Sequence, residues 1–499
     1  MKKWAANAIC PVGILLLLTG IPTTQEVAGQ AIGIFDAQAD IGAPAKSGSA
    51  SYDEAGQSYH VAGSGYNVWF DRDEFHYVWK RVNGDFILRA NARLIGDGKD
   101  PHRKLGWMVR SGLDEGDAHV SAALHGDGLA ALQFRRSNGG ESEEIKSTVD
   151  APDVVQLMRA GNVYTMSVAR SGDPLDKTEP VTVDLGDEVY VGLFVTSHDE
   201  EAVEEGEFWN VRIVHPAPDT LVPYRQYLGS NLEVLDIETG RRTIVYRHPA
   251  SIQAPNWTLD GKALIYNGDG LLYRFDLETL TPTVINTDFA NRNNNDHVIS
   301  FDGKRLAISH HSEDHDGQSI VYTVPIEGGV PKLVTPEGPS YLHGWSADDK
   351  YLVYTASRGG DYDIYKIPAD GGDEIRLTTA PGLDDGPEYT PDGKYIYFNS
   401  VRSGRMEIWR MKPDGSEQEQ LTDDEFNNWF PHISPDGKQV VFISYGDDVA
   451  PSDHPFYKHV YLQQMPLDGG ESKVIAYLYG GQGTINVPSW SPDGKRIAF

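Results

Sequence analysis

Trp490-Ser491-Pro492-Asp493-Gly494 is the last of six related stretches in this sequence, and these stretches decide the fold of the C-terminal half. The other five are WTLDG at 257–261, ISFDG at 299–303, WSADD at 345–349, YTPDG at 389–393 and ISPDG at 433–437. Successive copies begin 42 to 57 residues apart. Repeats of this length are typical of the four-stranded blades of a β-propeller.

Each copy indicates a tight turn that leads into a β-strand. In the last copy, proline fixes its own φ, aspartate bonds the nearby backbone and glycine accepts a positive φ. Two further strands follow in each unit, for example at 362–367 and 406–411. The last copy supplies two strands and the start of the repeat region supplies two more, at 487–489, 496–499, 232–236 and 242–246. Together these four strands make one shared blade, which predicts a closed ring of six blades.

Over residues 222–499 the repeats resemble those of TolB-type propellers, which are also described as WD40-like. The resemblance implies an all-β, six-bladed propeller, a fold found in binding platforms, prolyl oligopeptidases and polysaccharide lyases. TolB has an α/β domain before its propeller, whereas an all-β region stands there in this chain. The sequence contains no Gly-x-Ser-x-Gly motif, which disfavours a prolyl peptidase.

The N-terminal region, residues 31–215, alternates short apolar and polar runs and contains no helix of ordinary length. Asn83-Gly84, between expected strands at 77–82 and 85–90, is typical of a β-hairpin. Further strands are expected at 105–109, 119–124, 130–135, 163–169, 181–185, 189–195 and 208–214. So many short strands predict a two-sheet jelly-roll sandwich.

Segment 190–198 resembles the closing strand of concanavalin-like domains, and the resemblance implies contact with a glycan or another polymer. Residues 216–221 contain two prolines and are expected to form a linker to the propeller.

Residues 1–30 are typical of a signal peptide, because Lys2 and Lys3 precede an apolar segment at 9–21 and small residues follow from Ala28. That segment is too short to span a membrane as a helix. We therefore expect a periplasmic or secreted protein with no transmembrane span in its mature form. The formal net charge of −30 disfavours a nucleic-acid partner, because a phosphate backbone would be repelled.

Polar residues gather in the loops that precede the innermost strands and in those that join the second and third strands. Both sets of loops should surround one mouth of the central channel. The candidate ligand contacts are Asn295, Asp296, His297, His343, Arg358, Asp385, Arg402, Arg405 and Trp429. The candidate metal ligands are His297, His310, His311 and His343, because neutral imidazoles suit a divalent metal.

Three interpretations of this rim stay open. It is a recognition surface for a sugar or a peptide, without chemistry. Alternatively, the histidines bind Mn, Zn or Ca and the arginines hold a uronic acid, an arrangement that looks like the propeller-type oligogalacturonate lyases. In the third interpretation these are solvated loop residues. The long insertion at 446–458 is either a lid over the mouth or decoration.

The function that we favour is an exported binding protein, which recognises a polysaccharide or a cell-envelope partner through this face of the propeller. A metal-assisted polysaccharide lyase or glycosidase is the alternative, so the sequence leaves open whether the protein is an enzyme.

Overall fold

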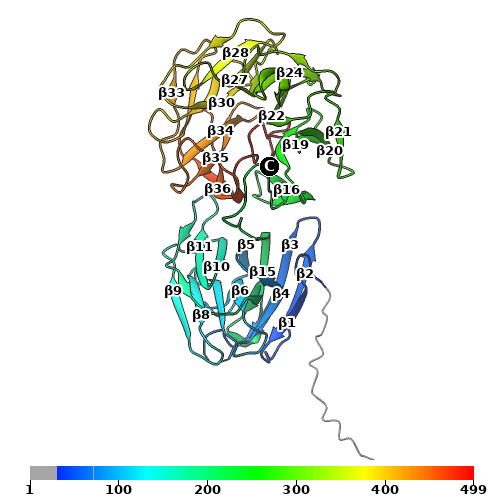
Figure 1. Cartoon of the computed structure of the whole chain (residues 1–499). Coiled ribbons are helices and arrows are strands. Elements are labelled where there is room, and N and C mark those ends of the chain that lie inside the picture. The colour runs from blue at the N-terminus through cyan, green and yellow to red at the C-terminus, as the bar shows by residue number, and fades with distance from the viewer. Residues whose placement is uncertain (1–30, 71) are drawn as a thin grey trace, which may run out of the picture.

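The computed structural model describes residues 31–70 and 72–499, so the predicted signal peptide at 1–30 lies outside the described residues. Figure 1 shows two all-β units, one above the other. The single helix among the described residues is the short 3-10 turn η1 (Glu313–His315). Within the same part of the chain, no helix is long and apolar enough to cross a membrane.

The first unit, which we call the N-terminal β-domain, contains two β-sheets. The strand order in one sheet is β1 (Ala37–Ile41), β4 (Phe75–Asn83), β14 (Glu188–Thr196), β6 (Lys104–Arg110), β7 (His119–His125), β8 (Ala130–Arg135), β9 (Ser142–Lys146). The order in the other is β12 (Asp176–Lys177), β11 (Val163–Ala169), β10 (Val154–Ala160), β5 (Phe86–Ile95), β15 (Asp199–Val214), β3 (Ser58–Gly65), β2 (Ser49–Asp53), with β13 (Val181–Thr182) beside β11.

The two sheets share one hydrophobic core. Leu88 and Phe208 of one sheet belong to the same buried cluster as Val109 and Leu193 of the other. All four side chains are completely buried, and burial of this kind stabilises the fold by about 25 cal/mol per Å² of apolar surface removed from water.

The hairpin predicted at Asn83-Gly84 is wrong, although both strands exist. β4 pairs with β1 and β14, whereas β5 pairs with β10 and β15 in the other sheet. A two-residue Asn-Gly hairpin needs a positive φ at both positions. Gly84 has one, at 72°, but Asn83 does not. The turn therefore carries the chain from one sheet to the other.

The second unit is a six-bladed β-propeller, in which five blades are antiparallel sheets of four strands. From the innermost strand outward, the blades are β18 (Gln253–Trp257), β19 (Ala263–Gly268), β20 (Leu271–Asp276), β21 (Thr281–Ile285); β22 (Asn293–Ile299), β23 (Arg305–His311), β24 (Ser319–Pro325), β25 (Lys332–Leu333); β26 (Ser340–Trp345), β27 (Tyr351–Ser357), β28 (Tyr362–Pro368), β29 (Ile375–Arg376); β30 (Asp384–Tyr389), β31 (Ile396–Ser400), β32 (Glu407–Met411), β33 (Glu419–Gln420); β34 (Asn427–Ile433), β35 (Gln439–Tyr445), β36 (Lys458–Pro466), β37 (Lys473–Gly480).

The sixth blade joins both ends of the repeat region, as predicted. Its strands are β17 (Arg242–His248), β16 (Ser230–Asp236) and β38 (Arg496–Ala498), and Val234 pairs with Ala498. The predicted innermost strand is reduced to a bridge between Trp490 and Ile497.

The repeated motif both closes a turn and connects neighbouring blades. The Ser434 hydroxyl donates to Asp436 at 2.7 Å, and the Gly437 N–H donates to the Ser434 carbonyl at 2.8 Å. The aromatic residue that starts the motif reaches the blade before it, since the Trp345 indole N–H donates to the Val298 carbonyl at 3.0 Å. The Trp490 indole makes the same kind of contact with the His432 carbonyl at 2.9 Å, so two of the six motifs connect blades in this way.

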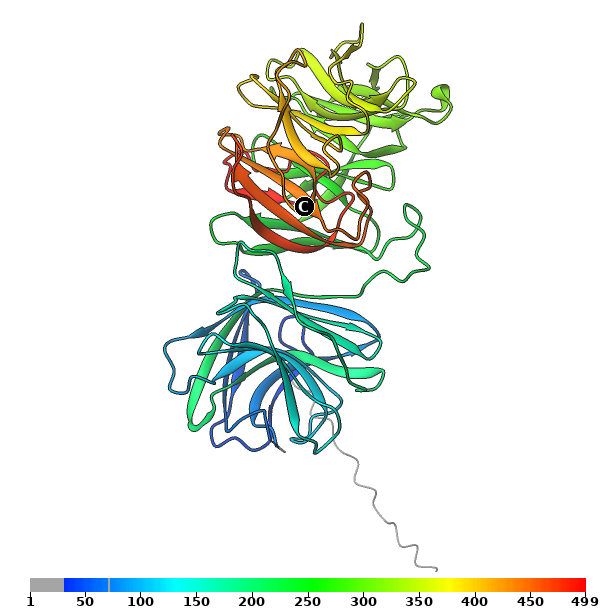
Figure 2. The same cartoon turned by 90° about the vertical axis from the view of Figure 1, so that its left-hand side faces the viewer.

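The N-terminal β-domain packs against the outer strands β17 and β37 of two neighbouring blades (Figure 2). The Tyr477 hydroxyl of β37 donates to the Asp173 carbonyl at 2.7 Å, and the Leu175 N–H donates to the Tyr461 hydroxyl at 3.1 Å. Residues 215–229, which include the linker predicted at 216–221, contain no strand, and this longer segment is the linker in the structure.

Candidate functional site

The channel mouth is shaped by β-bulges, one in the innermost strand of each complete blade. Asp296 lies in the bulge of β22, His343 in that of β26 and Phe430 in that of β34. Phe430 has a positive φ of 53°. A bulge adds an unpaired residue and turns its side chain away from the regular alternation, which explains how residues of three blades converge on the mouth.

Three of the predicted contact residues form a buried charged cluster. The His343 Nε2 atom lies 3.1 Å from the Asp385 carboxylate, which also accepts from the Thr355 hydroxyl at 2.7 Å. Burial raises the pKa of Asp296 to about 7; Asp385 adds to this rise, and His343 opposes it.

The His343–Asp385 pair is held in its charged form. Burial alone would lower the pKa of His343, but the hydrogen bond and charge of Asp385 hold that pKa above its ordinary value. Burial would likewise raise the pKa of Asp385, yet His343 holds it below its ordinary value. The pair therefore carries no net charge, whereas Asp296 adds a negative charge as the pH rises above about 7.

Aromatic rings pack beside this cluster, and Trp429 and Phe430 are buried. The rings of His343 and Phe430 are stacked at 5.8 Å, and Trp429 lies 5.6 Å from Phe430. His454, from the insertion at 446–458, packs its ring 4.5 Å from Trp429 and 5.3 Å from Phe430. The insertion thus lies over residues of the mouth, in the place expected of a lid.

Two of the predicted contact residues retain hydrogen-bond donors. The Nδ2 atom of Asn295 and the indole nitrogen of Trp429 are buried and have no hydrogen-bond partner among the described residues. Buried polar groups are usually paired, so these two donors are exceptions in the wall of the mouth.

The three predicted arginines do not join the cluster, because each is paired with an acidic residue nearby. Arg358 forms a bidentate ion pair with Glu374, with hydrogen bonds of 2.9 and 2.6 Å. Arg402 binds Asp384 at 2.6 Å, and Arg405 binds Asp447 at 2.6 Å. Two of these contacts reach innermost strands, since Asp384 belongs to β30 and Arg358 also donates to Ser340 of β26, so the three guanidinium groups already have carboxylate partners.

The four histidines predicted as metal ligands do not share a site. Within residues 31–70 and 72–499, no three His, Cys, Asp or Glu side chains are placed to hold a metal ion. The Nε2 atom of His297 lies 3.1 Å from the Ile265 carbonyl. His310 accepts from the Arg292 N–H, and His311 lies 3.1 Å from the Gly317 carbonyl. His343 pairs with Asp385 instead, so each imidazole has a different neighbour.

A buried histidine–carboxylate hydrogen bond in the channel wall was not predicted from the sequence. The Nδ1 atom of His432 lies 2.6 Å from Glu388 of the preceding blade, and Glu388 also accepts from the Ile433 N–H at 3.0 Å. The sequence contains a feature that indicates bulges here, because Pro387 and Pro431 precede Glu388 and His432. Proline cannot donate to a strand ladder and marks bulges.

Comparisons with known proteins agree with this architecture. The family model described as the TolB beta propeller domain matches residues 344–499. An uncharacterized protein of Agrobacterium fabrum is 47% identical over 273 residues, which are 54% of this chain and 92% of that protein.

Two solved structures are similar as well. The structure of putative TolB from Agrobacterium tumefaciens has a TM-score of 0.52 at 47% identity and covers 54% of this chain and 96% of its own. TolB from Acinetobacter baumannii has a TM-score of 0.41 at 19% identity, covering 59% and 77%.

Proposed function

This chain belongs to the TolB-like β-propeller family, and from that premise we propose that it is an exported binding protein whose channel mouth recognises a cell-envelope partner. The proposal includes a signal peptide at 1–30, a periplasmic or secreted location, and domains at 31–215 and 222–499 joined by residues 216–221. We also propose that the N-terminal β-domain is a concanavalin-like jelly roll that contacts a polymer.

The charge of the channel mouth supports a protein partner over an acidic polysaccharide. Asp296 and Asp385 face one cation, His343, so the cluster is negative once Asp296 ionises. A lysine or arginine of the partner would pair with Asp296 and relieve the cost of a buried unpaired carboxylate. Trp429 and Phe430 are buried under His454 of the insertion, and they would take an apolar side chain next to that cation once His454 moves aside. This arrangement of charged and aromatic groups is the observation that carries the proposal.

The lyase alternative receives no support from the geometry of the rim. It requires histidines that share a metal and arginines that are free to hold a uronic acid. The described histidines have separate partners, and Arg358, Arg402 and Arg405 are already paired with carboxylates.

Binding of short labelled peptides to the full-length protein tests the proposal. One peptide pool contains lysine and the other contains glutamate at the same positions; neutral polysaccharide serves as a third probe. We expect binding of the lysine pool alone, weakened about tenfold by Asp296→Asn, because a charge-assisted hydrogen bond is lost.

Asp370→Asn is the matched control, because Asp370 is an exposed aspartate in the turn between β28 and β29, at the propeller end opposite the mouth. Equal binding of both pools, or equal weakening by both substitutions, would overturn the proposal.

A further inference from the structure

A cleft of about 640 Å³ lies between the N-terminal β-domain and the propeller, and Asp296, His343 and Asp385 of the channel mouth are not among its lining residues. It is lined by β5 and β15 of the first unit, by β16, β17 and β37 of the second, and by the tip of the insertion at 446–458. Binding pockets for small molecules typically have volumes of about 300–1,000 Å³ and often form at domain interfaces. The cleft has the size and the position of a ligand site.

The charge of the cleft is opposite to that of the protein. Four arginines line it, Arg89, Arg212, Arg242 and Arg247, whereas Glu233 is the one acidic residue among its described lining residues. The whole chain has a net charge of −30. Burial lowers the pKa of Arg89 to about 9, and the nearby Arg242 adds to this lowering. A positive cleft in an acidic protein favours an anionic ligand.

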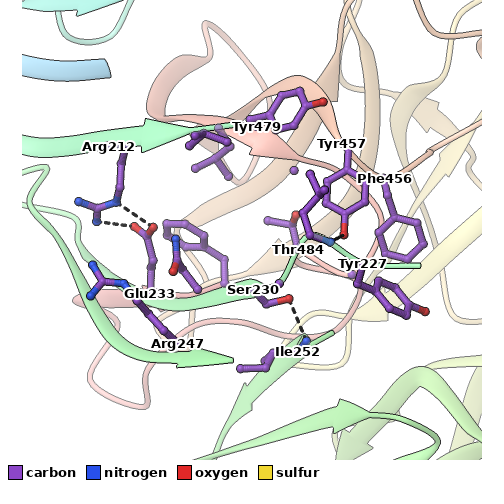
Figure 3. Close-up of a pocket in the computed structure, with 18 of the residues that line it drawn as sticks. Arg212, Tyr227, Ser230, Glu233, Arg247, Ile252, Phe456, Tyr457, Tyr479 and Thr484 are labelled. Atoms are coloured by element: carbon purple, nitrogen blue, oxygen red, sulfur yellow. Dashed lines mark hydrogen bonds and ion pairs between the residues drawn. The ribbon is translucent and has the colours of Figure 1, made fainter. Parts of the chain in front are cut away.

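One of these arginines is free to meet such a ligand. Glu233 is shared by Arg212 and Arg242, at 2.8 and 2.9 Å, and Arg89 donates to the Gln156 side chain. Arg247 is exposed, and within the described part of the chain its guanidinium makes no hydrogen bond or ion pair. Figure 3 shows Arg247 and the Arg212–Glu233 pair on one side of the cleft.

Aromatic rings occupy the opposite side, as Figure 3 also shows. Phe456 packs at 5.8 Å from Tyr227 and 5.9 Å from Tyr457, and Tyr457 stacks at 6.2 Å on Tyr479. The Tyr457 hydroxyl accepts from the Leu228 N–H at 2.9 Å, so the linker holds this ring in place. All four rings are half-buried, which leaves part of each one open to the cleft.

We propose that this cleft is a second ligand site, separate from the channel mouth, and that it binds a carboxylated oligosaccharide. The apolar faces of the sugar rings would pack on Phe456, Tyr457 and Tyr479, because aromatic side chains combine an apolar body with a polar tip. A sugar carboxylate would form a bidentate ion pair with the guanidinium of Arg247. The site needs both units, since the arginines come from each of them and the aromatic rings come from the propeller and the linker.

Isothermal titration of the full-length protein with tetragalacturonate tests the proposal, with neutral maltotetraose as the comparison sugar. We expect binding of the acidic sugar alone, and weaker binding at higher ionic strength, because exposed charges are screened. Arg247→Gln should weaken the binding about tenfold or more, whereas Arg247→Lys should keep part of it. Arg225→Gln is the matched control, because Arg225 is an exposed linker arginine that does not line the cleft.

Arg247 is exposed, so its substitution should leave the thermal unfolding temperature unchanged, and this measurement accompanies each titration. The absence of binding at millimolar tetragalacturonate would overturn the proposal. So would equal affinity for maltotetraose, or equal affinities of the Arg247→Gln and Arg225→Gln proteins.

Discussion

Glu233→Gln tests how the two units are held together. The Glu233 carboxylate lies between Arg212 of the N-terminal β-domain and Arg242 of the propeller, and it accepts four hydrogen bonds or ion pairs from them at 2.8 to 3.0 Å. All three side chains are almost completely buried. The substitution keeps the shape of the side chain but leaves two buried arginines without their shared anion.

Two routes give the size of the effect. Removing one partner from a buried ion pair typically costs about 3–5 kcal/mol. Independently, the two arginines outweigh burial and lower the pKa of Glu233 from 4.5 to about 2. At about 1.4 kcal/mol per pKa unit, this lowering corresponds to about 3 kcal/mol of stability. We therefore expect Glu233→Gln to lower the free energy of unfolding by about 3 kcal/mol at neutral pH.

The pH dependence follows from the direction of this shift. A carboxyl group with a lowered pKa in the folded state stabilises the protein fully above its unfolded pKa of 4.5, and that contribution is lost as the pH falls toward about 2. Urea unfolding followed by tryptophan fluorescence, at neutral and acidic pH, measures the difference between wild type and variant. That difference should shrink as the pH decreases.

Glu238→Gln is the control, because Glu238 is an exposed residue in the turn between β16 and β17 and should change stability by less than about 0.5 kcal/mol. A loss of unfolding free energy below about 1 kcal/mol for Glu233→Gln at neutral pH would refute the idea that Glu233 holds the two units together, since an exposed ion pair contributes that much. A difference that stays constant on acidification would refute it as well.

Three further predictions concern other contacts. Binding of the lysine peptide pool should strengthen as the pH rises through about 7, because Asp296 then ionises. Fluorescence anisotropy measures this affinity, which should not depend on pH in the Asp296→Asn protein. The same pH profile in both proteins would contradict the prediction. Asp436→Ala removes the acceptor for Ser434 and for the Lys438 N–H, so urea unfolding should show a loss of about 1 kcal/mol, and an unchanged midpoint would contradict the role of the turn. Tyr477→Phe removes the hydrogen bond to the Asp173 carbonyl and should also lower the free energy of unfolding by about 1 kcal/mol in the same assay. An unchanged free energy of unfolding would contradict a stabilising role for this contact between the two units.

The sequence predicted the propeller because its signal is local and repeated. Ser, Pro, Asp and Gly each have a physical reason at their position in the turn, and six copies determine the number of blades. The same local reasoning failed at Asn83-Gly84, because the pairing of β4 and β5 is decided by the sheet that each strand joins.

The site was predicted only in part. Asp296, His343 and Asp385 lie near one another, because loops of one rim must converge, but their role in binding stays a prediction. The partners of Arg358 and Arg402 were not foreseen, since Glu374 and Asp384 approach them through the three-dimensional arrangement of each blade.

The cleft could not be predicted at all. It exists because Arg212 and Glu233 join two separately folded units, and no local pattern in the sequence reports how two domains pack against each other.

Site-specific photo-crosslinking in cells that export the protein tests the central claim, that the channel mouth holds the partner. A benzophenone amino acid replaces Tyr341, which lies near Asp296 and Asp385. Burial raises the pKa of the Tyr341 hydroxyl. The same group replaces Lys394, an exposed residue of the turn at the opposite end of the propeller. We predict a discrete protein adduct from position 341 that Asp296→Asn abolishes, and none from position 394. No adduct from 341, or the same adducts from both positions, would contradict the claim.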